Sequence, residues 1–198
     1  MRSLARFAAS FGVAATLCLS AAAQSNASTN NSQMGATGQT QGQNAKPLAS
    51  PAAEAHVTLA GKTITIHYNS PRMRGRKIMG ELVPYGKVWR TGANPATSFV
   101  TEGDIQIGDL NVPAGKYTLY TMPAAPGTPW QLIINKQTGQ WGTVYNEGQD
   151  LGRTPMQQSK LSSPQENMSI SFEHTTANST ELHVKWETTD EWVKIEAK

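Results

Sequence analysis

Basic and aromatic side chains gather in one stretch of the chain, and residues of these types can together bind an anion. Between residues 72 and 90 there is a single acid, Glu81, among six cations: Arg72, Arg74, Arg76, Lys77, Lys87 and Arg90. Guanidinium groups bind carboxylates and phosphates, and the interleaved Tyr85 and Trp89 offer flat faces for sugar stacking or cation–π contacts. The stretch favours a small anionic ligand or a glycan. A solvated basic loop with Trp89 as a core anchor explains the same pattern.

Arg90 is the strongest single candidate in this stretch. It follows a tryptophan in a strand-like run and precedes the turn-forming sequence Thr91-Gly92-Ala93-Asn94. An arginine in this position is either held partly buried and directed at a ligand, or it pins the turn. The sequence does not decide between these two roles, and we include both Arg90 and Asn94 among the candidate residues.

A second stretch, residues 141–150, combines aromatic rings, amides and two acids with glycine. Sugar sites often use flat rings beside amide donors, and loops between strands commonly carry binding residues. An ordinary hairpin with Trp141 packed inward is the alternative. The full set of candidate ligand-binding residues is Arg72, Arg74, Tyr85, Lys87, Trp89, Arg90, Asn94, Trp141 and Tyr145.

The chain has four histidines: His56, His67, His174 and His183. Alternation places His67 and His183 opposite the apolar face of their strands, either in solvent or on a shallow sheet face. His174 is in phase with Ile170 and Phe172, which predicts a histidine at the edge of the core. No pair has an H-x-H or H-E-x-x-H spacing, so the sequence predicts no metal site and no cofactor. A zinc site assembled from separate strands is the remaining alternative.

Most catalytic templates are missing from the sequence. There is no G-x-S-x-G elbow and no glycine-rich phosphate loop, and the single cysteine, Cys18, excludes an internal disulfide. An enzyme, if the chain is one, would be a hydrolase or isomerase on a β scaffold. Its site would then lie among His67, His183, Glu147 and Asp150.

Short runs in which apolar and polar residues alternate are expected to form the strands that position these residues. They cover residues 56–59, 62–68, 98–101, 105–107, 117–122, 130–135, 168–174, 181–186 and 192–196, each bounded by Gly, Pro, Asn or Asp. This spacing predicts an all-β fold, an antiparallel β-sandwich of roughly eight to ten short strands, with a tight hairpin at Gly61. In residues 76–83, before Pro84, the apolar side chains recur at helical spacing. This segment forms either the one short helix or a buried irregular loop.

The first 54 residues have a different composition. Residues 1–23 are typical of a signal peptide: Arg2 and Arg6 precede a short apolar core, and three alanines end it. Residues 24–54 are polar and predict a disordered linker. Cleavage would leave 15 basic and 14 acidic residues, which does not favour a nucleic-acid partner. We expect export to the periplasm or the exterior, with no membrane span after cleavage and with the oligomeric state open.

Several motifs of residues 55–198 resemble one known family. They are S-P-R-M-R-G-R-K-I from residue 70, L-V-P-Y-G-K-V-W-R-T-G-A-N from residue 82, P-A-G-K-Y-T-L-Y from residue 113, W-Q-L-I-I-N-K from residue 130, and Q-W-G from residue 140. The chain is similar to the bacterial DUF2911 family, a domain of unknown function in exported proteins. The resemblance implies export and a β-rich fold, and it implies no activity.

Three hypotheses for the function follow from these observations. The first is a non-enzymatic exported module that binds an envelope glycan or a small anionic molecule. The second is the hydrolase or isomerase described above. The third is a structural envelope protein that contacts its partners through the linker or through an exposed strand edge.

Overall fold

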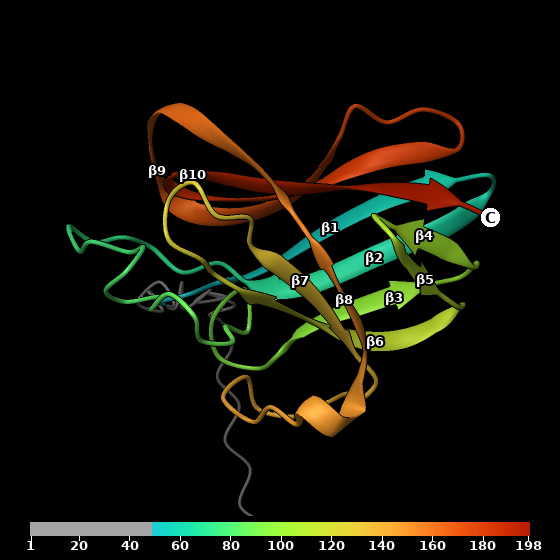
Figure 1. Cartoon of the computed structure of the whole chain (residues 1–198), viewed down its shortest axis with the longest axis horizontal. Helices are drawn as coiled ribbons and strands as arrows, with labels where there is room; N and C mark the ends of the chain where they lie inside the picture. The colour runs from blue at the N-terminus through green and yellow to red at the C-terminus, as the bar shows by residue number, and fades with distance from the viewer. Residues whose placement is uncertain (1–48) are drawn as a thin grey trace, which may run out of the picture. The chain divides into compact units, whose positions relative to one another are not determined.

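The computed structural model describes residues 49–198, which form ten β-strands and one short 3-10 turn (Figure 1). The elements are β1 (Ala52–Leu59), β2 (Lys62–Asn69), β3 (Thr97–Thr101), β4 (Ile105–Ile107), β5 (Leu110–Val112), β6 (Gly115–Met122), β7 (Gln131–Asn135), η1 (Glu147–Gln149), β8 (Asp150–Pro155), β9 (Gln157–Glu173) and β10 (Ser179–Ala197). The expected signal peptide and residues 24–48 of the expected linker lie outside the described residues. Within the described part of the chain, no helix is long and apolar enough to cross a membrane.

The strands form two sheets, in which all the neighbouring strands are antiparallel. One has the order β1-β2-β3-β6-β7-β8, and the other has the order β5-β4-β10-β9. Edge strands of the two sheets lie beside each other, β1 near β9 and β5 near β8. At the second of these edges a β-carbon on Gly152 would overlap Leu110, so glycine allows the close approach. The all-β prediction is confirmed.

Alternation decides which side chains of β2 enter the core. Ile64, Ile66 and Tyr68 are buried, whereas His67 points outward. The predicted hairpin before β2 is also present, since Leu59 pairs with Lys62 across a two-residue turn. Both turn residues have positive φ, which gives the mirror-image turn that matches the twist of the strands.

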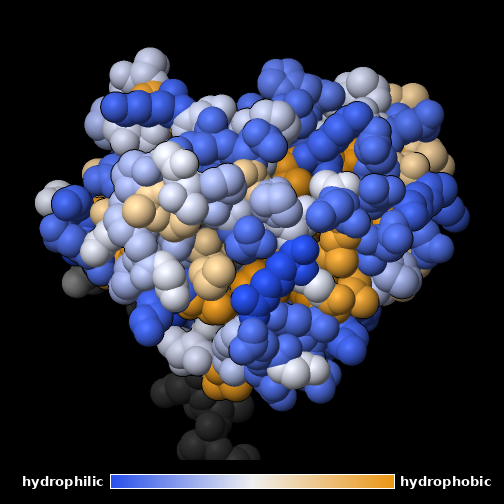
Figure 2. Space-filling model, in the orientation of Figure 1, coloured by the Kyte–Doolittle hydropathy of each residue, from blue (hydrophilic) through white to orange (hydrophobic). Residues whose placement is uncertain are grey.

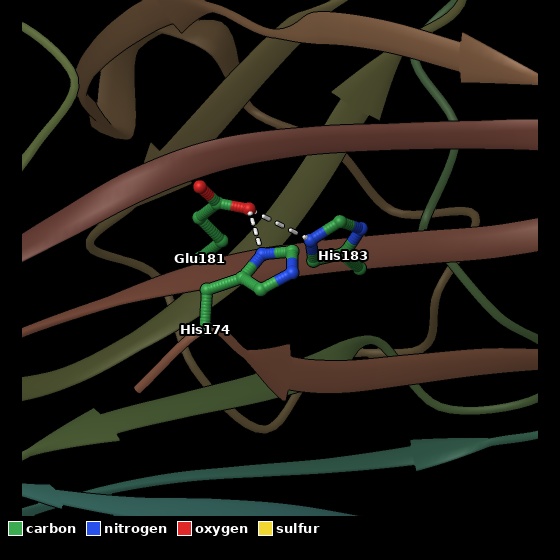
Figure 3. Close-up of side chains that lie close together, drawn as sticks. All are labelled: His174, Glu181 and His183. Atoms are coloured by element: carbon green, nitrogen blue, oxygen red, sulfur yellow. Dashed lines mark hydrogen bonds and ion pairs between the residues drawn. The ribbon is translucent and has the colours of Figure 1, made fainter. Parts of the chain in front are cut away.

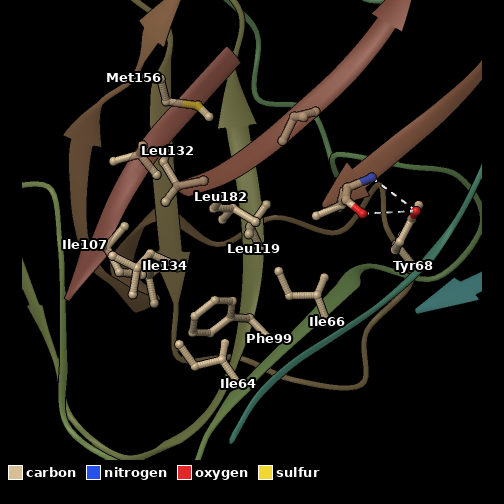
Figure 4. Packing of buried hydrophobic residues seen from close by; sticks show 14 of the residues in the cluster. Ile64, Ile66, Tyr68, Phe99, Ile107, Leu119, Leu132, Ile134, Met156 and Leu182 are labelled. Atoms are coloured by element: carbon tan, nitrogen blue, oxygen red, sulfur yellow. Dashed lines mark hydrogen bonds between the residues drawn. The ribbon is translucent and has the colours of Figure 1, made fainter. Parts of the chain in front are cut away.

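The core lies between the two sheets and is filled with aliphatic and aromatic side chains (Figure 4). Phe99 and Leu119 from the first sheet and Ile107 and Leu182 from the second are fully buried. The Tyr68 hydroxyl accepts a hydrogen bond from the Ile170 N–H at 3.1 Å and lies 3.4 Å from the carbonyl of the same residue. One phenol therefore links β2 to β9. The face seen in Figure 2 is mostly hydrophilic, with apolar patches near the centre of the view.

Two strands are much longer than predicted. β9 has 17 residues and β10 has 19, and the segments 181–186 and 192–196, predicted as separate strands, both belong to β10. The register between β9 and β10 shifts on both sides of Glu187, whose φ is 56°. Such bulges break the alternation of apolar and polar residues without ending the strand, so the sequence indicated two short strands. β5 and β8 were not predicted.

Residues 76–83 form an irregular loop, and not a helix, in which only Ile78, Met79 and Val83 are buried. The Glu81 and Val83 N–H groups both donate to the Ile78 carbonyl, at 3.2 and 3.0 Å. Gly80 has a φ of 89°, a conformation that interrupts helical geometry. The apolar side chains at helical spacing are therefore buried by loop packing, except that Leu82 is exposed.

Candidate functional site

A pocket of about 280 Å³ surrounds the turn that follows Arg90. Three of the predicted residues, Trp89, Arg90 and Asn94, line it together with a larger set that the sequence did not single out as ligand-binding: Ser50, Pro71, Arg76, Leu82, Val83, Gly92, Ala93 and Trp186. The pocket therefore joins the basic stretch of the chain to β10. Trp186 could not be found from spacing alone, because its alternation indicated only a core residue.

The Arg90 side chain is partly buried in this pocket. Its Nε is buried and has no hydrogen-bond partner in the described residues. No carboxylate of residues 49–198 lies within ion-pair distance of its guanidinium. Burial lowers the pKa of Arg90, although a guanidinium stays charged at neutral pH. A desolvated cation without a counter-ion is unfavourable, so Arg90 is an energetically costly group in the described structure.

The backbone beside Arg90 adopts a strained conformation. Thr91 is fully buried and has a φ of 52°, which is rare for a β-branched residue. Its hydroxyl lies 3.0 Å from the Thr121 hydroxyl, and its carbonyl accepts a hydrogen bond from the Thr97 hydroxyl at 2.9 Å. These contacts hold the turn in place, and strain of this kind is concentrated at functional sites.

The loop after β7 closes one side of Arg90. The Gly142 N–H donates to the Asn94 carbonyl at 3.2 Å. A β-carbon on Gly142 would overlap the Cδ of Arg90 and would lie 2.7 Å from the Asn94 carbonyl oxygen. Glycine is therefore required here, and it brings the neighbouring Trp141 to the turn, where Trp141 forms a bridge with Pro95. Trp141 is 56% exposed, so the alternative in which it packs inward is wrong.

Trp89 belongs to the core as well as to the pocket. Its ring stacks on Trp186 at 5.9 Å between centroids, with 17° between the planes, and meets Trp130 edge-on at 6.4 Å. The predicted core-anchor role is therefore present. A ligand could reach only the part of the ring that lines the pocket.

Trp141 adjoins the pocket through Gly142 but does not line it, and neither do four other predicted residues: Arg72, Arg74, Tyr85 and Lys87. Arg74 is exposed and donates to the Ala49 carbonyl at 3.3 Å, and the Tyr85 ring covers Gly80. Arg76, which belongs to the basic stretch but not to the candidate set, does line the pocket. Its guanidinium donates to the carbonyls of Met73 and Arg72 at 3.0 and 2.7 Å.

Tyr145 lies in a separate cluster around Arg153. The Tyr145 hydroxyl donates to Asp150 at 2.7 Å and accepts from Arg153 at 2.8 Å. Arg153 also pairs with Glu147 at 2.6 Å and with Asp150 at 3.0 Å. Burial, together with the hydrogen bond to Asp150, raises the pKa of Tyr145. These groups satisfy one another and stabilise the loop before β8.

The residues of the enzyme hypothesis do not come together in one site. His67 pairs with Glu54 at 3.1 Å on the outer side of β1 and β2. Glu147 and Asp150 share Arg153, while His183 contacts neither of them and pairs instead with Asp190 at 2.7 Å. No histidine–carboxylate pair is thus formed among these four candidates within the described residues.

The prediction for His174 is wrong, and the prediction for His183 is right in direction but not in exposure. His183 faces away from the core as alternation predicted, but it is only 4% exposed, because the ring of Trp192 stacks on it at 6.0 Å. The His174 side chain is 73% exposed and is not a core-edge residue. Its φ of 49° turns it out of the alternation of β9 and brings its ring 6.2 Å from that of His183.

Comparison with known proteins supports the resemblance seen in the sequence. The family model described as a protein of unknown function, DUF2911, matches residues 50–195. Searches of curated proteins and of solved structures returned no match. The match covers β1 to β9 in full and all of β10 except its last two residues. The chain therefore belongs to the DUF2911 family.

Proposed function

We propose that this protein is a binding module for a small anionic ligand, which Arg90 holds in the pocket. The observation that carries the proposal is the partly buried Arg90 guanidinium, whose Nε has no partner in the described residues. A carboxylate or phosphate group would supply two oxygen acceptors in the geometry that a guanidinium fork prefers. The Arg76 guanidinium is held by backbone carbonyls and adds a second positive charge to the lining of the pocket.

An acidic sugar is the ligand class that best fits the surroundings of Arg90. Trp141 is exposed and adjoins Gly142, which packs against Arg90. An exposed indole beside a cation can stack on a sugar ring while the cation binds its acidic group. The proposal therefore specifies a glycan or monosaccharide with a carboxylate or phosphate, and it requires no catalytic step.

The test is titration calorimetry of the full chain with glucuronate, glucose 6-phosphate, inorganic phosphate and neutral glucose. We expect the acidic sugars to bind and glucose not to bind. Arg90→Ala should weaken binding at least about tenfold, the loss expected when a charged hydrogen bond worth about 1.5–3 kcal/mol is removed. Arg74→Ala is the matched control, because it removes the same charge from an exposed position.

A second variant perturbs the same site by crowding it, without removing a charge. Gly142→Ala leaves every charge in place but forces Arg90 and the Asn94 carbonyl to move. It should also abolish binding of the acidic sugars, while circular dichroism confirms that the fold is retained. Equal affinity in wild type and Arg90→Ala, or no heat with any of the anions, would exclude the proposal and favour the structural envelope role.

A further inference from the structure

A second group of side chains lies on the outer face of β10, away from the Arg90 pocket. His174, Glu181 and His183 each direct one ligand atom toward the others, and these three atoms all lie within 4.8 Å of one another (Figure 3). The Oε2 atom of Glu181 is 2.7 Å from the Nδ1 of His174 and 3.3 Å from the Nε2 of His183. One carboxylate oxygen is thus placed between two imidazole nitrogens.

The bend of β10 fixes the orientation of His183. Residues 183 and 190 would be about 23 Å apart in a straight strand, at about 3.3 Å per residue. The register shifts around Glu187 bend the strand, and the Nδ1 of His183 lies 2.7 Å from the Oδ1 of Asp190. Asp190 is itself buried. It therefore fixes the proton on Nδ1 and leaves the lone pair of Nε2 directed at Glu181.

Carboxylates outnumber the lysines and arginines around His183. Its Nε2 faces Glu181 at 3.3 Å and Glu173 at 4.0 Å, so a neutral imidazole would place its lone pair against carboxylate oxygens. The carboxylates of Glu173, Glu181 and Asp190 are opposed by a single lysine, Lys185, which pairs with Glu173 at 2.6 Å. With neutral histidines the cluster carries two formal negative charges. One divalent cation would balance them.

We propose that His174, Glu181 and His183 form a binding site for a divalent transition-metal ion, with Asp190 as the outer partner of His183. Two imidazoles and a carboxylate suit Zn²⁺ and its neighbours, whereas Mg²⁺ and Ca²⁺ prefer all-oxygen ligands. Ligands about 2.0–2.2 Å from a tetrahedral metal lie roughly 3.3–3.6 Å apart, so only small side-chain shifts are needed. A fourth position remains for water or for Glu173.

The site is accessible from solvent, because His174 is largely exposed while His183 is buried beneath it. A metal could enter over His174 and be held by the buried imidazole below. The sequence signal that was missed is the pair Glu181 and His183, two residues apart on one strand and therefore on the same face. Only the positive φ of His174 adds the third ligand, and alternation could not predict it.

The experiment uses the full chain without a polyhistidine tag. Thermal unfolding is followed with Zn²⁺, Co²⁺, Ni²⁺, Mg²⁺ and a chelator, and the visible spectrum is recorded with Co²⁺. Zn²⁺ at about 100 times its dissociation constant should raise the Tm by several degrees, and chelator should reverse the shift. Co²⁺ should show the intense bands of a four-coordinate site, and Mg²⁺ should have no effect.

His174→Ala is the decisive variant, because the side chain is exposed and its removal leaves the core intact. It should lower Zn²⁺ affinity at least tenfold, and Asp190→Asn should lower it by roughly 10- to 100-fold. His67→Ala is the matched control, since His67 is also exposed and also lies beside a glutamate. No response to any transition metal, or a Zn²⁺ response that His174→Ala leaves unchanged, would refute the site.

Discussion

At the scale of single residues, partial burial sets Arg90 apart from an exposed arginine. An exposed arginine binds water as readily as it binds an anion, and it discriminates little between them. Arg90 has already lost part of its hydration in the folded protein, and Gly142 and the strained Thr91 turn restrict its position. In the proposed binding role, a ligand would therefore meet a charge whose desolvation has been offset by the free energy of folding.

A different buried charge, Glu191, should make stability depend on pH. Glu191 is fully buried; its Oε1 accepts a hydrogen bond from Gln158 at 2.8 Å, and its Oε2 has no partner in the described residues. Burial, with a smaller contribution from Asp190, raises its pKa to about 7. Because the folded-state pKa exceeds the unfolded value, the stabilising effect of the proton is complete below about pH 4.5. It is lost as pH rises through about 7.

Glu191→Gln should therefore stabilise the protein at pH 8 by on the order of 1–3 kcal/mol, because a neutral amide removes the cost of the buried charge. The difference from wild type should shrink toward zero as the pH is lowered to 5. Urea unfolding at both pH values measures this. A variant that is equally or less stable than wild type at pH 8 would show that Glu191 is solvated or paired when ionised.

At the scale of elements, the tight turn between β1 and β2 offers a place to stabilise the fold. Ala60 has a φ of 48° and precedes Gly61, whose φ is 76°. Asparagine tolerates the left-handed conformation better than alanine, and Asn-Gly is the preferred pair for this turn. Ala60→Asn should raise stability by up to about 1 kcal/mol in thermal unfolding. Thr58→Asn, on the outer side of β1, is the control and should give no gain.

The elements also show what the sequence could predict and what it could not. Where strands are straight and one face is buried, as in β2, alternation was sufficient to assign both the strand and its inward residues. It failed at β10, where the bend at Glu187 places Asp190 against His183. The Arg90 position was identified because its neighbours are turn-forming. The Gly142 contact and the His174 ligand were missed, since both depend on pairing between distant segments.

At the scale of the whole molecule, the expected signal peptide can be tested directly, although it lies outside the described residues. We propose that residues 1–23 direct export and are then removed. When the full chain is expressed in a bacterium, the protein in the periplasmic or external fraction should begin at Gln24, as intact-mass spectrometry would show. A cytoplasmic protein that keeps Met1 would disprove the leader, but it would not affect the Arg90 site.

The position of β10 within its sheet has a consequence for how the chain must be made. β10 lies between β4 and β9, and it follows both of them in the sequence. β9 pairs with residues 181–192 of β10 and β4 with residues 195–197, so the second sheet is complete only when the whole of β10 is present. Without β10, β4 pairs only with β5, β9 has no partner strand in its sheet, and the core between the two sheets is incomplete. We therefore expect a truncation within β10 to leave the second sheet incomplete and to give a species prone to aggregate.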